Sequence, residues 1–398
     1  MPVGTPFHPR TFALCESLSY REWSGYYAVS AYETHHEHEY NAIRSAAALI
    51  DISPLFKYIV SGPGAARLVD RVITRDVASI GVGRVAYTPW CDERGMVIDD
   101  GTVARLDERR FRWTAAEPTL RWLHQNAAGL DVAIDDVSES VAALALQGPL
   151  AARVLRACGA DIDSLRYFGA GPATIGGIAV DISRTGYTGD LGYEIWVPAG
   201  RAIEVWDALI AVGAPLGARP AGLLALDVAR VEAGLLLLDV DFTGSRKAMT
   251  VDQQYSPIEM GLERLVDLDK PAFVGREALA AETARPPRRR IVGLEVDWND
   301  VERLHERAGL VPVAPAAASR TAVPVMKGGR QVGRATTTAW SPSLKRLIAI
   351  ATIDAQHCAP GSRLKFEITI DARREWASAT VAPMPFLNPP RKTATPPL

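Results

Sequence analysis

The chain has 398 residues, of which 48% are hydrophobic and 23% are charged, the composition of a globular protein with more than one core. Its formal net charge of −2 gives no general attraction to nucleic acid or to an anionic membrane surface, so neither is expected as a partner. No apolar stretch reaches the ~20 residues of a membrane helix, and the N-terminus lacks the features of a signal peptide, which predicts a cytoplasmic protein. The four cysteines form no CxxC pair, so we expect reduced thiols and no cysteine-bound metal.

The first part of the chain predicts mixed helices and strands. Residues 28–49 contain few helix breakers and predict one long helix that stops before Pro54. A β-branched run at 57–62 predicts a strand, and 65–77 predicts a helix. Further strands are expected at 84–90, 95–104 and 111–115. This order favours an α+β fold over the regular alternation of a doubly wound sheet.

A second segment begins near residue 140. We expect strands at 178–183 and 193–197, and helices after Pro149, at 201–212 and at 222–234. Residues 283–290 hold two prolines and four arginines, and a solvated linker is the favoured interpretation over a phosphate site. The predicted domains are therefore 1–283, with an internal break near 140, and a β domain at 290–388. The proline-rich tail 389–398 is predicted to be disordered.

The most informative local pattern is RTGYTGDLGYEI at residues 184–195. Its three glycines lie between two strands, where they allow a tight turn and a close approach of the backbone to a ligand. Glu194 lies in the hydrophobic strand that follows, and a carboxylate there is costly unless something donates to it. The paired N–H donors of a pterin ring would match such a carboxylate. From the residue types alone, a structural hairpin is the favoured interpretation.

A second pattern is the pair Asp99 and Asp100 within the strand predicted at 95–104. Adjacent strand residues point to opposite faces, so at most one of the two faces a pocket. The other is either exposed to solvent or caps a turn. Calcium would require oxygen ligands at a regular spacing, which is missing.

Other site patterns are weak. Residues 32–40 hold three histidines and three glutamates, but no HExxH order, so an amphipathic helix with a polar side is favoured over a metal site. The Gly169-Ala170-Gly171 run lacks the third glycine of a dinucleotide fingerprint, and neither a phosphate loop nor a GxSxG elbow occurs. A nucleotide-dependent enzyme or a serine hydrolase is therefore not expected.

Five ordered motifs resemble the aminomethyltransferase (glycine-cleavage T-protein) family over roughly residues 5–385. The segment 184–195 resembles that family's RTGYTGE-x-GYEI signature. The other four are the strand pair 81–100 with its two aspartates, the QGP turn at 145–149, the RLEAG-like run 230–234 and the GREAL-like run 273–279.

The resemblance implies a three-domain, cloverleaf-like α+β fold with a C-terminal β-barrel-like domain and tetrahydrofolate in its central hole. It implies that Asp100 is the catalytic carboxylate and that Glu194 holds the pterin ring. Residues implied near the cofactor are Tyr87, Tyr187, Arg230 and Asp99.

Three departures from the family pattern bear on the substrate. Leu226 stands where the glycine-cleavage proteins have an arginine, residues 115–117 replace an Asn-Ala motif, and residues 51–55 differ from DVSHM. These changes resemble the sarcosine, dimethylglycine and methyl-ether or sulfonium demethylase branches. The expected function is transfer of a methyl or aminomethyl-derived methylene group from a small-molecule donor to tetrahydrofolate, with a lipoyl carrier protein as a candidate partner.

The alternative is a non-catalytic folate-binding protein that supports iron–sulfur cluster assembly, whose cysteine-containing KGCYTGQE turn is absent here. The donor, the choice between methyl and methylene transfer, the need for a carrier and the oligomeric state stay open.

Overall fold

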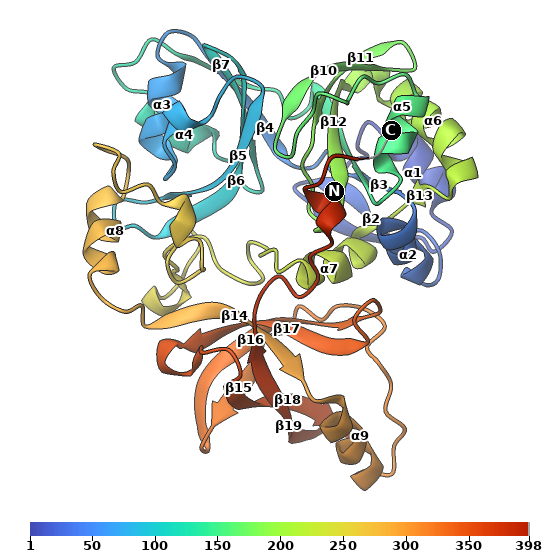
Figure 1. Cartoon of the computed structure of the whole chain (residues 1–398), viewed down its shortest axis with the longest axis vertical. Helices are drawn as coiled ribbons and strands as arrows, with labels where there is room; N and C mark the ends of the chain where they lie inside the picture. Colours follow the sequence, from blue (N-terminus) through green and yellow to red (C-terminus); the bar gives the residue numbers. More distant parts are fainter. Residues whose placement is uncertain (397–398) are drawn as a thin grey trace.

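The computed structural model describes residues 1–396, which form three lobes arranged like a clover leaf (Figure 1). The first lobe is a five-stranded antiparallel sheet in the order β5-β6-β7-β4-β8, and most of its strands match the predicted runs. Its strands are β4 (Phe56–Ser61), β5 (Arg84–Cys91), β6 (Val97–Asp107), β7 (Arg110–Ala115) and β8 (Ala133–Asp136). Helices α3 (Ala65–Val72) and α4 (Leu120–Asn126) pack on it, because Leu68, Val69 and Val72 share one apolar face of α3.

The second lobe is built on a six-stranded sheet in the order β10-β11-β12-β9-β3-β13. Its strands are β3 (Ala48–Asp51), β9 (Val141–Gln147), β10 (Ala170–Ile175), β11 (Ile178–Ser183), β12 (Gly192–Pro198) and β13 (Arg219–Pro220). Helices of this lobe are α1 (His8–Leu14), α2 (Glu37–Ser45), α5 (Ala151–Ala157), α6 (Ala202–Gly213) and α7 (Leu223–Glu232). The hairpin β1 (Ser19–Trp23) and β2 (Tyr26–Ala31) forms a separate two-stranded sheet.

The third lobe is a closed barrel in the strand order β14-β17-β16-β15-β18-β19. Its elements are β14 (Arg289–Val296), α9 (Trp298–Arg307), β15 (Val323–Lys327), β16 (Arg330–Ser341), β17 (Arg346–Asp354), β18 (Arg363–Ile370) and β19 (Arg373–Ala382). Helix α8 (Arg276–Thr283) precedes the barrel and lies beside the first lobe, as Figure 1 shows. The predicted α+β fold with a C-terminal barrel is confirmed.

The predicted helix over residues 28–49 is wrong. This stretch contains the end of β2, then α2, then β3, which pairs with β9 in the second lobe. Tertiary packing overrides the helix propensity of the alanines here, because residues 28–31 are all buried in β2. The boundary near residue 140 falls between β8 and β9, which belong to different sheets, but residues 1–51 belong to the second lobe and not to the first.

The C-terminal tail also differs from its prediction over the residues that the structure describes. After the barrel, the segment 383–396 runs back across the second lobe, and Pro390–Lys392 forms a 3₁₀ helix (Figure 1). Arg391 makes two hydrogen bonds with the carboxylate of Asp190, at 2.7 and 2.8 Å. Residues 397 and 398 of the predicted disordered tail lie outside the described residues.

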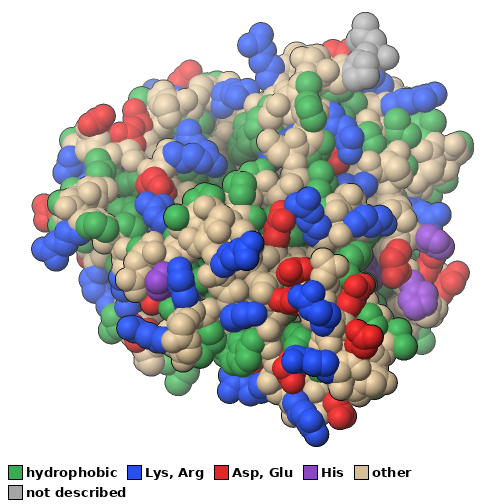
Figure 2. Space-filling view, turned by 60° about the horizontal axis from the view of Figure 1, so that its bottom comes forward, with side chains coloured by type: hydrophobic (Ala, Val, Ile, Leu, Met, Phe, Trp, Pro, Cys, Tyr) green, Lys and Arg blue, Asp and Glu red, His purple; other side chains and the backbone are tan. Residues whose placement is uncertain are grey.

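Basic and acidic side chains are interspersed on the face shown in Figure 2, in agreement with the small net charge. None of the helices within residues 1–396 combines the length and the hydropathy needed to cross a membrane.

Candidate functional site

A cavity of about 1270 Å³ lies where the three lobes meet. Small-molecule sites usually measure roughly 300–1,000 Å³, so this cavity has room for a large ligand together with a small one. Its wall takes residues from β5 and β6 of the first lobe, from β12 and α7 of the second lobe, and from the end of the barrel strand β19.

The two predicted aspartates are neighbours on β6, which pairs with β5, and their side chains point in opposite directions. Asp100 lines the cavity, whereas the fully buried Asp99 points away from it and accepts hydrogen bonds from the backbone N–H groups of Asp100 and Glu117, at 2.7 and 3.1 Å. The prediction that at most one of the pair faces a pocket agrees with this geometry. Asp99 therefore fixes the end of the neighbouring strand β7, and the structure does not bring it to the cavity.

Asp100 and Tyr87 form a hydrogen-bonded pair in the cavity wall. The Tyr87 hydroxyl donates to the Asp100 carboxylate at 2.5 Å. Burial raises the pKa of Asp100 to about 6, although the Tyr87 hydrogen bond opposes this rise. Burial, followed by the nearby Asp100 charge, raises the pKa of Tyr87 well above its ordinary value. Asp100 can therefore exchange a proton near neutral pH, while Tyr87 keeps its own.

Glu194 approaches the cavity from the opposite lobe, on β12. Thr185 donates a hydrogen bond to it at 2.6 Å, and Thr185 is itself 2.9 Å from the Ser183 hydroxyl. Burial raises the pKa of Glu194, while the Thr185 hydrogen bond and the Arg112 guanidinium lower it. Thr185 donates to one oxygen of the Glu194 carboxylate, and a carboxylate with its several lone pairs can still accept from a ligand donor.

The turn between β11 and β12 is held by Gln147, which lies fully buried at the end of β9. Its amide donates to the backbone oxygens of Thr185 and Tyr193, both at 3.3 Å, and accepts from the Thr188 hydroxyl at 2.9 Å. A Cβ atom at Gly186 would come within 2.0 Å of this amide. Glycine is required there because backbone packs directly on the glutamine, and this packing sets where Glu194 emerges.

Two further predicted residues have different positions. Tyr187 lines the cavity, and its hydroxyl donates to the backbone oxygen of Leu236. Arg230 is fully buried behind the wall, where it pairs with Asp241 and donates to Thr337 of the barrel at 3.0 Å. The Arg230 guanidinium joins α7 to the barrel and is not part of the cavity wall, so its role as a cofactor contact stays a prediction.

Leu226 and Asp227 lie on the wall formed by α7. Arg320, from the loop before β15, makes hydrogen bonds of 2.7 and 2.8 Å with Asp227, and Arg21 of β1 approaches the same carboxylate at 3.4 Å. All four residues line the cavity. Leu226 thus presents an apolar side chain to the cavity, while two guanidinium groups lie nearby.

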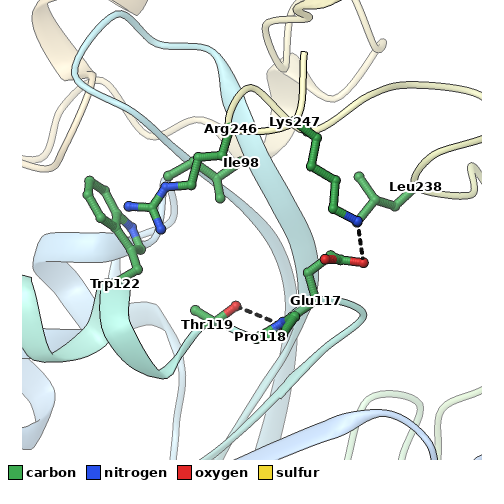
Figure 3. A pocket seen from close by; sticks show the side chains of 9 residues that line it. Ile98, Glu117, Pro118, Thr119, Trp122, Leu238, Arg246 and Lys247 are labelled. Atoms are coloured by element: carbon green, nitrogen blue, oxygen red, sulfur yellow. Dashed lines mark hydrogen bonds and ion pairs between the residues drawn. The ribbon is translucent and has the colours of Figure 1, made fainter. Parts of the chain in front are cut away.

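A smaller pocket adjoins the cavity and shares Glu117 and Leu238 with it. Figure 3 shows the Arg246 guanidinium facing the Trp122 ring, and the distance from its central carbon to the ring centroid is 4.4 Å. Lys247 forms an ion pair with Glu117 at 2.8 Å in the same view and a second one with Asp239 at 2.7 Å. The contacts with Trp122 and Glu117 fasten the loop after α7 to the first lobe, and the pair with Asp239 lies within this loop.

The histidine-rich stretch 32–40 contributes to structure. Glu39 is buried and accepts hydrogen bonds from the backbone N–H groups of Tyr32 and Gly222, at 2.6 and 2.7 Å, just before α7 begins. Within residues 1–396 no cluster of three or more His, Cys, Asp or Glu side chains could hold a metal ion.

Sequence reasoning did not single out Gln147 or Arg112 as parts of the site. Gln147 falls within the QGP motif, which could have identified it. Arg112 lies in a plain strand, and no local signal marks it.

Comparisons with known proteins agree with this geometry. The model of the GCVT N-terminal domain matches residues 10–270, and that of the glycine cleavage T-protein C-terminal barrel domain matches residues 289–388. An aminomethyltransferase of Streptomyces avermitilis is 35% identical over 397 residues, covering 97% of this chain and 99% of that protein.

A trimethylamine-oxide aldolase of Ruegeria pomeroyi is 33% identical over 404 residues, which cover 98% of this chain but 47% of that protein. The crystal structure of glycine cleavage system aminomethyltransferase T from Bartonella henselae superposes with a TM-score of 0.83 at 24% identity, covering 98% of this chain and 99% of that one. This likeness shows a common fold.

Proposed function

Because the chain belongs to the glycine cleavage T-protein family, we propose that it transfers a one-carbon unit from a small methylated or aminomethylated donor to tetrahydrofolate. The observation that carries this proposal is the pair of carboxylates, Asp100 and Glu194, that face one cavity from two different lobes. Burial raises the pKa of both. Perturbed carboxylates in a large cavity are typical of a catalytic site.

The residues present fit tetrahydrofolate. Its aminopyrimidine edge carries adjacent N–H donors, and Glu194 offers a carboxylate with an oxygen that Thr185 does not occupy. Charge-assisted hydrogen bonds of this kind are stronger than neutral ones, particularly in a buried site. The cavity is large enough to hold a donor beside a bulky cofactor.

In the proposed mechanism, tetrahydrofolate supplies the nitrogen nucleophile that accepts the one-carbon unit. Asp100 would accept the proton that leaves this nitrogen as the new N–C bond forms; the bond between the carbon and the donor atom would break, and the donor atom would keep the electron pair and take up the proton from Asp100. Tyr87 orients Asp100 through its hydrogen bond and keeps the carboxylate oxygen in place. The remaining acceleration comes from holding two reactants next to each other in one cavity.

The wall near α7 favours a demethylase-like donor. Leu226 presents an apolar surface, which suits methyl groups on nitrogen, sulfur or oxygen better than the arginine of glycine-cleavage relatives does. The existence of a trimethylamine-oxide aldolase relative supports the proposal that the one-carbon donor varies within the family. An aminomethyl-lipoyl arm delivered by a carrier protein is the competing donor, and it would enter the same cavity.

The non-catalytic alternative is less well supported. A protein that only binds folate needs the anchor at Glu194 but has no use for a second carboxylate at the reacting end. In this chain Asp100 supplies such a second carboxylate, and burial raises its pKa to about 6, which suits proton transfer at neutral pH.

The experiment begins with calorimetric titration of the purified protein with tetrahydrofolate. The complex is then incubated with methylated amines, thioethers, methoxy-aromatics and an aminomethyl-lipoyl carrier, and the folate products are identified by mass spectrometry. A 5-methyl product supports demethylation, and a methylene product that requires the carrier supports aminomethyl transfer. Folate binding without any product would favour the non-catalytic alternative, and absence of binding would refute the proposal.

A further inference from the structure

The C-terminal tail contacts both ends of the turn between β11 and β12. At the start of this turn, the buried Arg184 donates hydrogen bonds to the backbone oxygens of Lys392 and Ala394, at 3.5 and 2.5 Å. At the end of the turn, Arg391 donates to both oxygens of the Asp190 carboxylate, at 2.7 and 2.8 Å. The tail therefore bridges the two ends of the turn where it crosses the second lobe (Figure 1).

The charge balance beneath the turn requires the tail. Asp190 and Glu232 both have fully buried carboxylates, and the buried Arg44 pairs with both of them, at 3.3 and 2.6 Å. One guanidinium cannot neutralise two carboxylates, and an uncompensated buried charge is strongly destabilising. Arg391 supplies the second positive charge, and it also donates to the backbone oxygen of Arg44 at 3.1 Å. This balance favours a docked tail.

Arg184 depends on the tail for its hydrogen bonds. Besides the two tail oxygens, its guanidinium donates to the backbone oxygen of Leu165, at the longer distance of 3.4 Å. A buried guanidinium without good acceptors is costly, so the short hydrogen bond to Ala394 stabilises the position of the Arg184 side chain.

The turn between these two ends carries the contacts that position the proposed cofactor anchor. Thr185, at its start, donates to the Glu194 carboxylate at 2.6 Å. Thr188, near its end, donates to the buried Gln147 at 2.9 Å, and its backbone oxygen accepts from Arg44 at 2.9 Å. A shift of either end of the turn would therefore displace the side chains that hold Glu194.

We propose that the tail holds this turn in place, and that Arg391 and Arg184 are positioning residues for tetrahydrofolate because their contacts set the location of the Glu194 carboxylate. This inference rests on the proposed function, in which Glu194 anchors the pterin ring. Thr185 and Glu194 line the cavity, but neither Arg184 nor Arg391 does. The two arginines therefore act through the turn and not by touching the ligand.

The test is a double-mutant cycle on tetrahydrofolate binding, measured by calorimetry in Arg391→Gln, in Asp190→Asn and in the double variant. We expect each single change to weaken binding by about tenfold, since small displacements of a binding group are costly. The double variant should be no more than about threefold weaker than either single one, because both changes break the same contact. Arg330→Gln, on an exposed barrel hairpin, is the matched control for charge and should bind as the natural protein does.

Two further measurements separate positioning from a general structural effect. In Arg391→Gln the KM for tetrahydrofolate should rise by about tenfold, while kcat at saturating folate should stay within about twofold of the natural value. Arg391→Lys keeps the charge but loses the paired N–H donors, so it should restore part of the lost affinity. The Arg391 side chain is 43% exposed, so this position is open to substitution even if Asp190→Asn fails to fold.

Unchanged tetrahydrofolate affinity in Arg391→Gln would overturn this inference, as would fully additive effects of the two single changes. In both cases the natural protein still binds folate, so the proposed function stands. If the natural protein does not bind tetrahydrofolate, the proposed function itself fails and the inference fails with it. Circular dichroism of the variants shows whether they fold.

Discussion

Replacing Asp100 by asparagine removes a titratable carboxylate while nearly preserving its shape. The substitution tests both the catalytic role of Asp100 and the free-energy cost of burying its charged form. Asparagine still accepts the hydrogen bond from Tyr87 but cannot take a proton. General base catalysis contributes typically 10²–10⁴-fold, so we expect kcat to fall by about that factor. Folate affinity should change by less than about threefold, because Glu194 and not Asp100 anchors the ring.

The same substitution should stabilise the fold. The pKa of Asp100 is about 6 in the folded protein and close to 3.8 when unperturbed, so the folded state holds its proton more tightly than the unfolded state. Stability therefore falls as pH rises through this interval and stays low above it. About two pKa units at 1.36 kcal/mol each correspond to roughly 3 kcal/mol in favour of Asp100→Asn at pH 8, and to about half of that at pH 5.

The assays are single-turnover kinetics with folate product detection, and thermal unfolding at pH 5 and pH 8. Asp99→Asn is the matched control, since it makes the same change at the neighbouring carboxyl group, which points away from the cavity. Its kcat should stay within about tenfold of the natural value. Full activity in Asp100→Asn, or a gain in melting temperature that is larger at pH 5 than at pH 8, would refute the reasoning.

Three more predictions concern other residues of the candidate site and its support. Tyr87→Phe removes the hydrogen bond that lowers the pKa of Asp100. The acidic limb of the kcat/KM profile, expected near pH 6, should therefore move to higher pH. An unchanged or lower midpoint of this limb would contradict the role of Tyr87. Glu194→Gln should weaken tetrahydrofolate binding by about 10–100-fold in calorimetry, the loss of a charge-assisted hydrogen bond, whereas an unchanged Kd would remove the anchor assignment. Gly186→Ala should destabilise the protein by about 1–3 kcal/mol because its Cβ would clash with Gln147, while Gly200→Ala, with open space around it, should leave the melting temperature nearly unchanged.

Local patterns were sufficient where a structure depends on neighbours in the sequence. The strands β5, β6 and β7 follow from their β-branched and alternating residues, and the helix after Gly64 follows from its apolar face. The two faces of β6 were likewise predictable, because strand geometry alone sends Asp99 and Asp100 in opposite directions. The identification of Glu194 as a cavity residue needed the family resemblance as well, since residue types favoured a plain hairpin.

Other features depend on contacts between distant residues, which local patterns do not contain. The stretch 28–49 became two strands and a short helix because β3 pairs with β9, about a hundred residues away in the chain. Arg230 lies in a motif that resembles the family's, but contacts with Asp241 and Thr337 set the direction of its side chain. The composition of the tail predicted disorder, but hydrogen bonds with Asp190 and Arg184 hold its described residues in place.

An ion pair between the first and second lobes helps to explain how two carboxylates from separate sheets come to face each other. Arg112 of β7 in the first lobe reaches Asp181 of β11 in the second lobe at 3.1 Å, and it stacks on the Trp196 ring at 4.3 Å. Arg112 is buried but Asp181 is about half exposed, so water screens this pair and the packing of the guanidinium on Trp196 adds to it in opposing a slip of one lobe along the other. The same guanidinium lowers the pKa of Glu194 against the effect of burial. Arg112 therefore aligns the lobes and favours the charged form of the proposed anchor, so the correct ionisation of the site is coupled to the correct docking of the lobes.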